Sequence, residues 1–189
     1  MAQATQDRVH NFSAGPAALP LRALEEAQRD LLVLPGAGAS VMEISHRSKT
    51  FLAVLEDAKA NIKNLMKLPD NYRVLFIQGG ASLQFSMVAM NLLQNSPEAA
   101  DYILTGAWGN KAIKEAQKVG KTNVAWSGKS ENHIRVPAQS ELSLNPNAPY
   151  VHITSNETIE GVEFREEPET GNVPLICDAS SNFLSKPVP

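Results

Sequence analysis

The feature that most constrains the fold lies at residues 74–94, where a short apolar run is interrupted by two glycines and followed at once by an amphipathic run. Val74–Ile77 has the length and composition of a buried strand, and residues 82–94 carry apolar side chains at helical spacing. Gly79 and Gly80 predict a tight turn between them, because glycine adopts backbone conformations that other residues avoid. A strand, a tight turn and a helix in this order are typical of α/β proteins.

The start of this helix is predicted to bind an anion. The first N–H groups of a helix have no intrahelical partner and lie at the positive end of its dipole, which makes such ends frequent phosphate sites. Gly79 and Gly80 would let the backbone approach a ligand closely, and Ser82 would add a hydroxyl. Many strand–glycine–helix turns bind nothing, so this turn by itself does not define a site.

The rest of the chain continues this alternation. Strands are predicted at 73–77, 101–105, 123–126, 150–154 and 173–177, and helices at 21–34, 49–67, 82–94 and 109–119. Residues 127–149 are polar, with one short helix predicted near Ala138. Several strands are continuous apolar runs, which is typical of strands buried on both faces of a parallel sheet. The predicted fold is therefore α/β, with a mostly parallel sheet flanked by helices.

Composition and charge narrow the possible functions. The 189 residues are 43% hydrophobic, enough for a sizeable core, and the net charge of −3 with 17 scattered basic residues argues against a nucleic-acid partner. No apolar stretch reaches the roughly 20 residues that span a bilayer, and the N-terminus lacks an apolar signal core. The single cysteine excludes an internal disulfide and a cysteine-based metal cluster. We expect a cytoplasmic protein without a metal centre or a membrane partner.

In a parallel sheet, ligands bind beyond the carboxyl ends of the strands, so the residues that follow each strand are candidates for a site. These residues are Gly79–Ser82, Gly106–Trp108, Ser155–Thr158 and Asp178–Ser181. They would supply a phosphate cradle, an aromatic face, a hydroxyl and a carboxylate. That combination suits pyridoxal phosphate, whose ring nitrogen must be kept protonated by an acid.

Each candidate also has a plainer interpretation. Trp108 could be an ordinary core aromatic, Asp178 could cap a turn, and Thr158 could be an unremarkable loop residue. His46 and Arg47 precede a predicted helix and could serve only in capping or solvation. The case for a site therefore depends on four suitable groups following four successive strands.

Six segments, in this order and spacing, resemble the phosphoserine aminotransferase family of pyridoxal-phosphate enzymes. The match runs from about Val9 to the last residues and is carried by Asn11–Ala17, Glu43–Ser48, Gln78–Phe85, Thr105–Gly109, Ser155–Gly161 and Cys177–Leu184. The resemblance implies the N-terminal part of an aspartate-aminotransferase-like (fold type I) large domain. It implies an extended segment at residues 1–20 and an incomplete cofactor-binding domain at residues 21–189.

The resemblance also implies roles for individual residues. Ala81 and Ser82, with Gly80, would bind the cofactor phosphate. The remaining cofactor contacts would be stacking by Trp108, a hydrogen bond from Thr158 to the ring hydroxyl, and pairing of Asp178 with the ring nitrogen. His46 and Arg47 would bind the carboxylate or phosphate of a substrate, because a guanidinium matches such anions.

The implied activity is amino transfer from glutamate to 3-phosphohydroxypyruvate, giving phosphoserine for serine biosynthesis. Family members form homodimers, so a homodimer or a complementing C-terminal chain is the implied partner. The family's Schiff-base lysine lies in a Gln-Lys pair beyond Pro189, and Lys186 does not occupy that position. No catalytic residue is therefore expected in this chain, which should be inactive unless it is complemented.

Other interpretations remain open. A non-catalytic α/β binding or assembly module could keep the same fold, and the cofactor residues alone do not distinguish one fold-type-I aminotransferase from another. The Phe12–Pro16 and Ser45–Ser48 segments favour phosphoserine. A nucleotide-binding domain is disfavoured, because Gly79-Gly80 fits neither the dinucleotide glycine spacing nor the Gly-Lys-Ser/Thr loop.

Overall fold

A computed structural model describes residues 8–13, 15 and 17–187, which belong to two compact units. The first unit contains the described residues up to Leu75 together with Pro187, and the second contains Phe76–Lys186. Residues 1–7 and 188–189, and Ala14 and Pro16 of the predicted N-terminal segment, lie outside the described residues.

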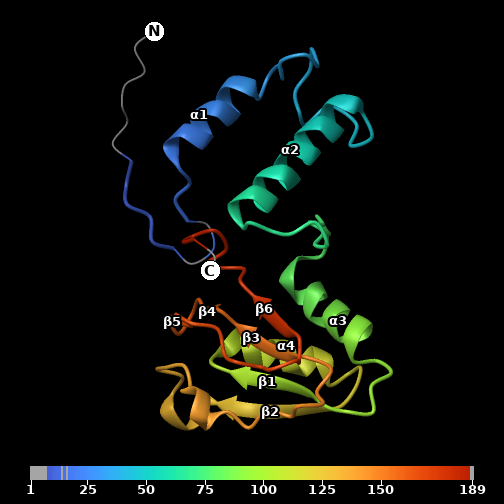
Figure 1. The fold of residues 1–189 in the computed structure, drawn as a ribbon. Coiled ribbons are helices and arrows are strands. Elements are labelled where there is room, and N and C mark those ends of the chain that lie inside the picture. The colour runs from blue at the N-terminus through green and yellow to red at the C-terminus, as the bar shows by residue number, and fades with distance from the viewer. Residues whose placement is uncertain (1–7, 14, 16, 188–189) are drawn as a thin grey trace. The chain divides into compact units, whose positions relative to one another are not determined.

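The first unit contains two helices, α1 (Leu21–Asp30) and α2 (Lys49–Leu65) (Figure 1). The hydroxyl of Ser48 caps α2 by accepting a hydrogen bond from the Phe51 N–H at 3.2 Å. Helix α1 ends at Asp30, four residues before the predicted end at Leu34. None of the helices in the described residues has the length and hydropathy needed to cross a membrane.

The second unit is built on a four-stranded parallel sheet, as predicted. Its strands are β1 (Ala100–Leu104), β2 (Thr122–Ser127), β3 (Val151–Thr154) and β6 (Leu175–Asp178), in the order β2-β1-β3-β6. All three pairs of neighbouring strands run parallel. The continuous apolar runs correspond to β1 and β3, in which every residue is buried.

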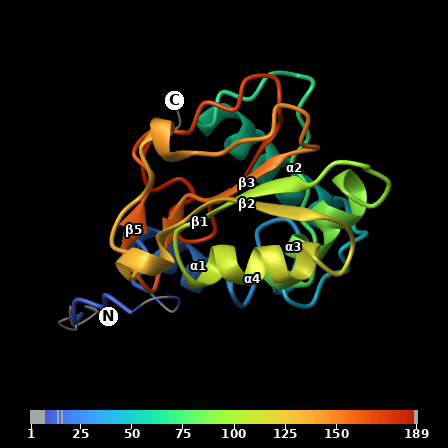
Figure 2. The same cartoon turned by 90° about the horizontal axis from the view of Figure 1, so that it is seen from below.

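Helices α3 (Gly80–Leu92) and α4 (Ala107–Ala116) pack together, and Figure 2 shows α4 along one face of the sheet. Tyr102 and Leu104 of β1 join the core with these helices. Ile103 points to the other face and packs with Phe164 and Val173, because successive side chains of a strand alternate between faces.

The other face of the sheet is covered by residues 136–144 and by a small hairpin. Two short 3₁₀ helices lie at Gly128–Glu131 and Gln139–Glu141, and the second confirms the helix predicted near Ala138. The antiparallel hairpin of β4 (Asn156–Glu157) and β5 (Val162–Glu163) was not predicted, because each strand is only two residues long.

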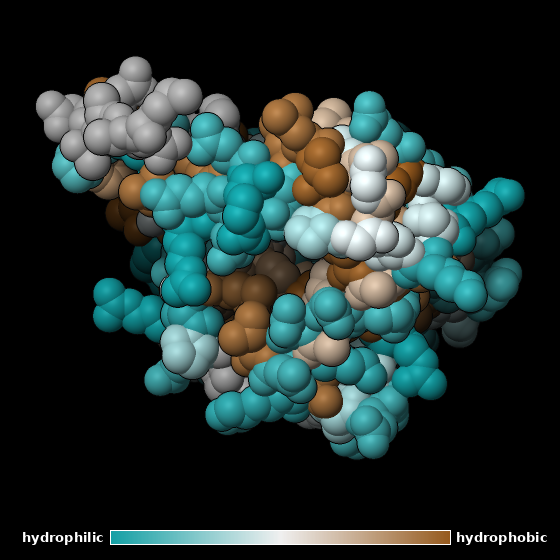
Figure 3. Space-filling model, turned by 90° about the horizontal axis from the view of Figure 1, so that it is seen from above, coloured by the Kyte–Doolittle hydropathy of each residue, from teal (hydrophilic) through white to brown (hydrophobic). Residues whose placement is uncertain are grey.

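The strand predicted at 73–77 does not form, and this prediction is wrong. Leu75, Phe76 and Ile77 are 70%, 58% and 45% exposed. A strand needs a neighbour to pair its backbone N–H and C=O groups, and no strand in the described residues pairs with this segment. Other large apolar side chains are also exposed, and Figure 3 shows hydrophobic patches on the molecular surface.

Candidate functional site

Helix α3 begins directly at the glycine turn. Gly79 has a φ of 100° and Gly80 a φ of 59°, both in the left-handed region. A Cβ on Gly79 would lie 2.3 Å from Cδ2 of Leu83, so space as well as conformation requires glycine there. No side chain caps this helix, which leaves its first N–H groups available to a ligand.

The side chains beside this turn link the predicted phosphate residue to the predicted stacking residue. Ser82 is exposed, and its hydroxyl accepts a hydrogen bond from Nζ of Lys111 at 2.8 Å. The same Nζ lies 5.2 Å from the centroid of the Trp108 ring. Trp108 is partly buried in the first turn of α4. Sequence reasoning missed Lys111, although its spacing from Trp108 places both on one face of a helix.

The N-terminus of α4, in contrast, is occupied by two carboxylates. Glu157 is fully buried, and its two carboxylate oxygens accept hydrogen bonds from the N–H groups of Trp108 and Gly109, each at 2.9 Å. Oε1 of Glu160 accepts from the N–H of Ala107, also at 2.9 Å. Burial raises the pKa of the Glu157 carboxyl, against the opposing effect of the two N–H donors. These glutamates hold the helix turn that carries Trp108.

Gly106 leaves the room that these two carboxylates need. A Cβ at this position would lie 2.6 Å from Oε2 of Glu160 and 2.7 Å from Cδ of Glu157. Its φ of 179° is ordinary extended backbone, so the requirement for glycine is one of space alone. The sequence pattern did not reveal the two glutamates, because their partners lie about 50 residues earlier in the chain.

Thr158 and Asp178 lie at the same end of the sheet. Thr158 is partly buried in the turn that follows Glu157. Asp178 ends β6 in register with Thr154 of β3, and its Oδ1 accepts hydrogen bonds from the N–H and hydroxyl of Ser180 at 3.1 and 2.5 Å. The second carboxylate oxygen of Asp178 takes no part in these two contacts.

His152, the second residue of β3, packs between Tyr102 of β1 and helix α3. Its side chain is 3% exposed and stacks on Tyr102 at 5.0 Å between ring centroids, with Phe85 of α3 edge-on at 6.1 Å. Burial lowers the pKa of His152 to about 4, although Asp178 acts in the opposite direction. The imidazole is therefore neutral at physiological pH.

His46 and Arg47 belong to the first unit. Both are exposed in the turn before α2, and the Arg47 N–H donates a hydrogen bond to Oγ of Ser45 at 3.2 Å. Their role towards a substrate, and their relation to the cofactor residues, stay predictions.

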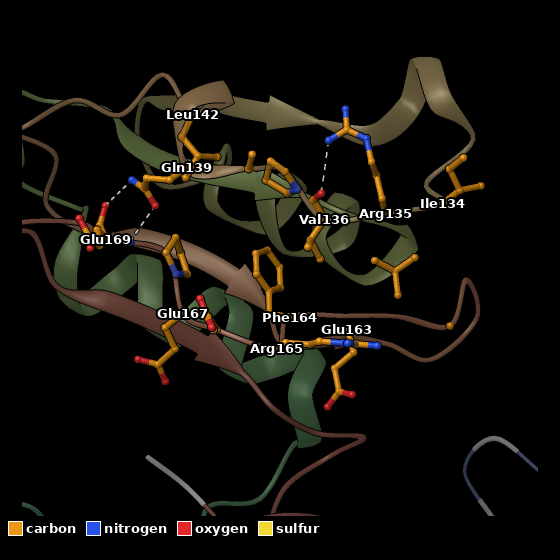
Figure 4. Close-up of a pocket in the computed structure, with 16 residues that line it drawn as sticks. Ile134, Arg135, Val136, Gln139, Leu142, Glu163, Phe164, Arg165, Glu167 and Glu169 are labelled. Atoms are coloured by element: carbon orange, nitrogen blue, oxygen red, sulfur yellow. Dashed lines mark hydrogen bonds between the residues drawn. The ribbon is translucent and has the colours of Figure 1, made fainter.

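A separate groove of about 910 Å³ lies in the second unit, and none of the predicted site residues lines it (Figure 4). It is formed by residues 134–139, 142 and 161–169. Arg135 pairs with Glu131 and Glu141 at 2.6 Å, and its hydrogen bonds to Glu141 lower the pKa of that carboxyl to about 2. No group of three or more His, Cys, Asp or Glu side chains is arranged to hold a metal ion in the part of the chain that the structure describes.

The four-stranded parallel sheet flanked by helices is a fold of the aminotransferase class, and the family comparison agrees. The model of the aminotransferase class-V family matches residues 9–189, and the chain belongs to this family. It is 54% identical over 184 residues to phosphoserine aminotransferase of Desulfatibacillum aliphaticivorans, covering 97% of this chain and 50% of that protein. It is 51% identical to the chloroplastic phosphoserine aminotransferase 1 of Arabidopsis thaliana, covering 97% and 43%.

Solved structures agree with the sequence relatives. Phosphoserine aminotransferase of Bacillus circulans subsp. alkalophilus superimposes with a TM-score of 0.92 at 48% identity, over 97% of this chain and 51% of that one. The pyridoxal-phosphate-bound enzyme of Trichomonas vaginalis gives 0.88 at 41% identity, over 96% and 54%. The chain thus spans about half the length of the relatives that it matches.

Proposed function

We propose that this chain provides the cofactor-binding part of a pyridoxal-phosphate-dependent aminotransferase that acts on glutamate and 3-phosphohydroxypyruvate. The observation that supports the proposal is the uncapped N-terminus of α3, where Lys111 links Ser82 to Trp108. Asp178, at the carboxyl end of β6, is the predicted partner of the ring nitrogen. The close similarity to phosphoserine aminotransferases supports the choice of activity.

The chemistry of the donor set fits this cofactor, which when bound supplies an electron sink for charge that develops on the substrate carbon. The N–H groups of Ala81 and Ser82, and the Ser82 hydroxyl, would bind the phosphate. Trp108 would lie against the pyridine ring, and the Thr158 hydroxyl would donate to the ring oxygen. The Asp178 carboxylate would hold a proton on the ring nitrogen, because an adjacent negative charge favours the protonated form.

Substrate binding is assigned to the first unit. Arg47, with His46 beside it, would bind the carboxylate or phosphate of glutamate or phosphoserine through a planar, charged donor pair. We assign the Schiff-base lysine to none of the described residues. Lys186 pairs with Glu163 at 2.9 Å, which holds its ammonium in a salt bridge. A homodimer, or a complementing chain, would complete the enzyme.

Cofactor binding is tested with pyridoxamine 5′-phosphate, which has no aldehyde to react with surface lysines. We expect calorimetric titration to detect binding to the 189-residue chain, and Asp178→Asn and Trp108→Leu each to weaken it about tenfold or more. Asp57→Asn in α2 is the matched control and should leave binding unchanged. Lack of binding, or equal binding by all variants, contradicts the proposal.

Activity is tested by expressing the chain together with the matching second half of a full-length relative. We expect glutamate-dependent amination of 3-phosphohydroxypyruvate, with Arg47→Ala raising KM more than it lowers kcat. An assembled but inactive complex favours the non-catalytic module, and preference for another oxo acid favours a different aminotransferase. A stoichiometric borohydride-trapped adduct on one lysine of this chain alone would overturn the assignment of the catalytic lysine.

A further inference from the structure

The second unit places a lysine ammonium where a helix dipole repels it. Nζ of Lys111 donates to the hydroxyl of Ser82 in the first turn of α3, at 2.8 Å. The first turn of a helix carries a partial positive charge, so a cation there is unfavourable without an anion. An exposed lysine has a long flexible side chain that can extend into solvent instead, and keeping it ordered costs rotamer entropy.

No carboxylate of the described residues forms a salt bridge with this ammonium. Among residues 8–13, 15 and 17–187, salt bridges with a nitrogen–oxygen distance of up to 4.0 Å do not include Lys111. Glu115, about one turn further along α4, feels the charge of Lys111, which helps to lower its pKa, but its oxygens are hydrogen-bonded to other groups. Its two oxygens accept from Nζ of Lys118 at 2.7 and 2.8 Å, and one also accepts from the Ser86 hydroxyl at 3.0 Å. The positive charge of Lys111 is thus only partly offset by Glu115, and its ammonium can still bind an external anion.

We propose that Lys111 is a phosphate-binding residue of the cofactor site, an assignment that rests on the proposed function. Lys111 contacts both residues that would bracket the cofactor, since its Nζ is hydrogen-bonded to Ser82 and lies 5.2 Å from the Trp108 ring centroid. A phosphate held by Ser82 is therefore within reach of the ammonium. Lys111 adds a charge-assisted donor to neutral N–H and hydroxyl groups, and such bonds are roughly twice as strong as neutral ones.

This role makes a prediction that an incidental surface lysine does not. The effect of Lys111 must depend on the phosphate of the ligand and not on its ring. The test compares pyridoxamine 5′-phosphate with pyridoxamine, titrated calorimetrically into the full chain. We expect Lys111→Met to weaken binding of the phosphorylated ligand about tenfold and to leave pyridoxamine binding unchanged.

Two further variants sharpen this test. Lys114→Met removes the same charge from an exposed position on the same helix and should leave both affinities unchanged. Lys111→Arg keeps the charge and should recover part of the lost affinity, which separates charge from packing. Circular dichroism and thermal unfolding verify that each variant is folded.

Equal affinity of Lys111→Met and Lys114→Met for pyridoxamine 5′-phosphate overturns the role of Lys111 while leaving the proposed function intact. If the unmodified chain binds neither vitamer, the proposed function fails, and inorganic phosphate then decides about Lys111. A ³¹P NMR shift of inorganic phosphate that Lys111→Met alone abolishes supports the anion site. No shift in any variant, or the same shift in all of them, rejects it.

Discussion

The N-termini of α3 and α4 belong to the same unit, yet the side chains around them carry opposite charges. Helix α4 has buried and partly buried carboxylates, Glu157 and Glu160, on its first N–H groups. Helix α3 has a glycine turn, no side-chain cap, and an ammonium from Lys111 beside its first turn. A helix end filled by the protein's own carboxylates has no donors left for a ligand. An uncapped end with added positive charge keeps its capacity for an external anion.

The largest expected effect comes from removing the buried carboxylate at the N-terminus of α4. Glu157→Ala leaves the N–H groups of Trp108 and Gly109 without their acceptor in a buried place and creates a small cavity. We expect the free energy of unfolding to fall by about 3–4 kcal/mol in urea titrations. Glu157→Gln keeps one acceptor and should lose less. Glu160→Ala, at a partly exposed cap, should cost about 1 kcal/mol. Equal losses for Glu157→Ala and Glu160→Ala would contradict the assigned difference.

Lowering the pH tests the packing between the sheet and α3, where His152 contacts Phe85. An unfolded histidine takes up a proton near pH 6.5, but the buried His152, with its pKa lowered to about 4, does not until lower pH. The contribution of His152 to the free energy of unfolding is therefore fully present above pH 6.5. It falls by up to about 3 kcal/mol as the pH drops from 6.5 towards 4. His152→Phe, which keeps an aromatic ring beside Tyr102, should remove this part of the pH dependence. An unchanged profile in that variant would show that other groups cause it.

The two glycine turns give a matched pair of substitutions. Gly79→Ala should cost about 2 kcal/mol, because alanine neither adopts a φ of 100° readily nor fits beside Leu83. Gly106→Ala has no conformational penalty, so its cost of about 1–2 kcal/mol should come from pushing Glu157 and Glu160 away. The double variant Gly106→Ala/Glu160→Ala should then lose less than the sum of the single ones. Strict additivity would show that the alanine and the glutamates do not interact.

The sequence predicts the locally encoded parts of this molecule well. The helical spacing, the Ser48 cap and the continuous apolar strands each depend on residues close together in the chain, and the structure confirms them. The strand at 73–77 failed because an apolar run becomes a strand only beside a partner, and none of the described strands pairs with it. Its composition is the same whether or not that partner is present.

The candidate site also has a part that is encoded locally in the sequence and a part that depends on residues far apart in the chain. The glycine turn before α3 is visible in the sequence, because conformation requires glycine at φ 100°. Glu157 as the cap of α4, and Lys111 beside Ser82, join residues 49 and 29 positions apart, and no spacing rule connects them. Only the fold brings these charges to particular helix ends. The roles of the predicted cofactor residues stay predictions until binding is measured.

The smallest expected effect is a change in melting temperature. Removing the charged side chain should change it in opposite directions at the two helix N-termini. Lys111→Met removes a cation from the positive end of α3 and should raise the melting temperature of the unliganded chain slightly, by about 1 °C. Glu160→Ala removes an anion from the same kind of end and should lower it. Differential scanning calorimetry at low and at 1 M salt measures both, with Lys114→Met as the control. Because salt screens exposed charges, the gain from Lys111→Met should vanish at 1 M, where the Debye length is about 3 Å. A lower melting temperature for Lys111→Met at low salt would mean that its contacts with Ser82 and Trp108 outweigh the dipole, so that the open end needs no anion to hold the lysine in place.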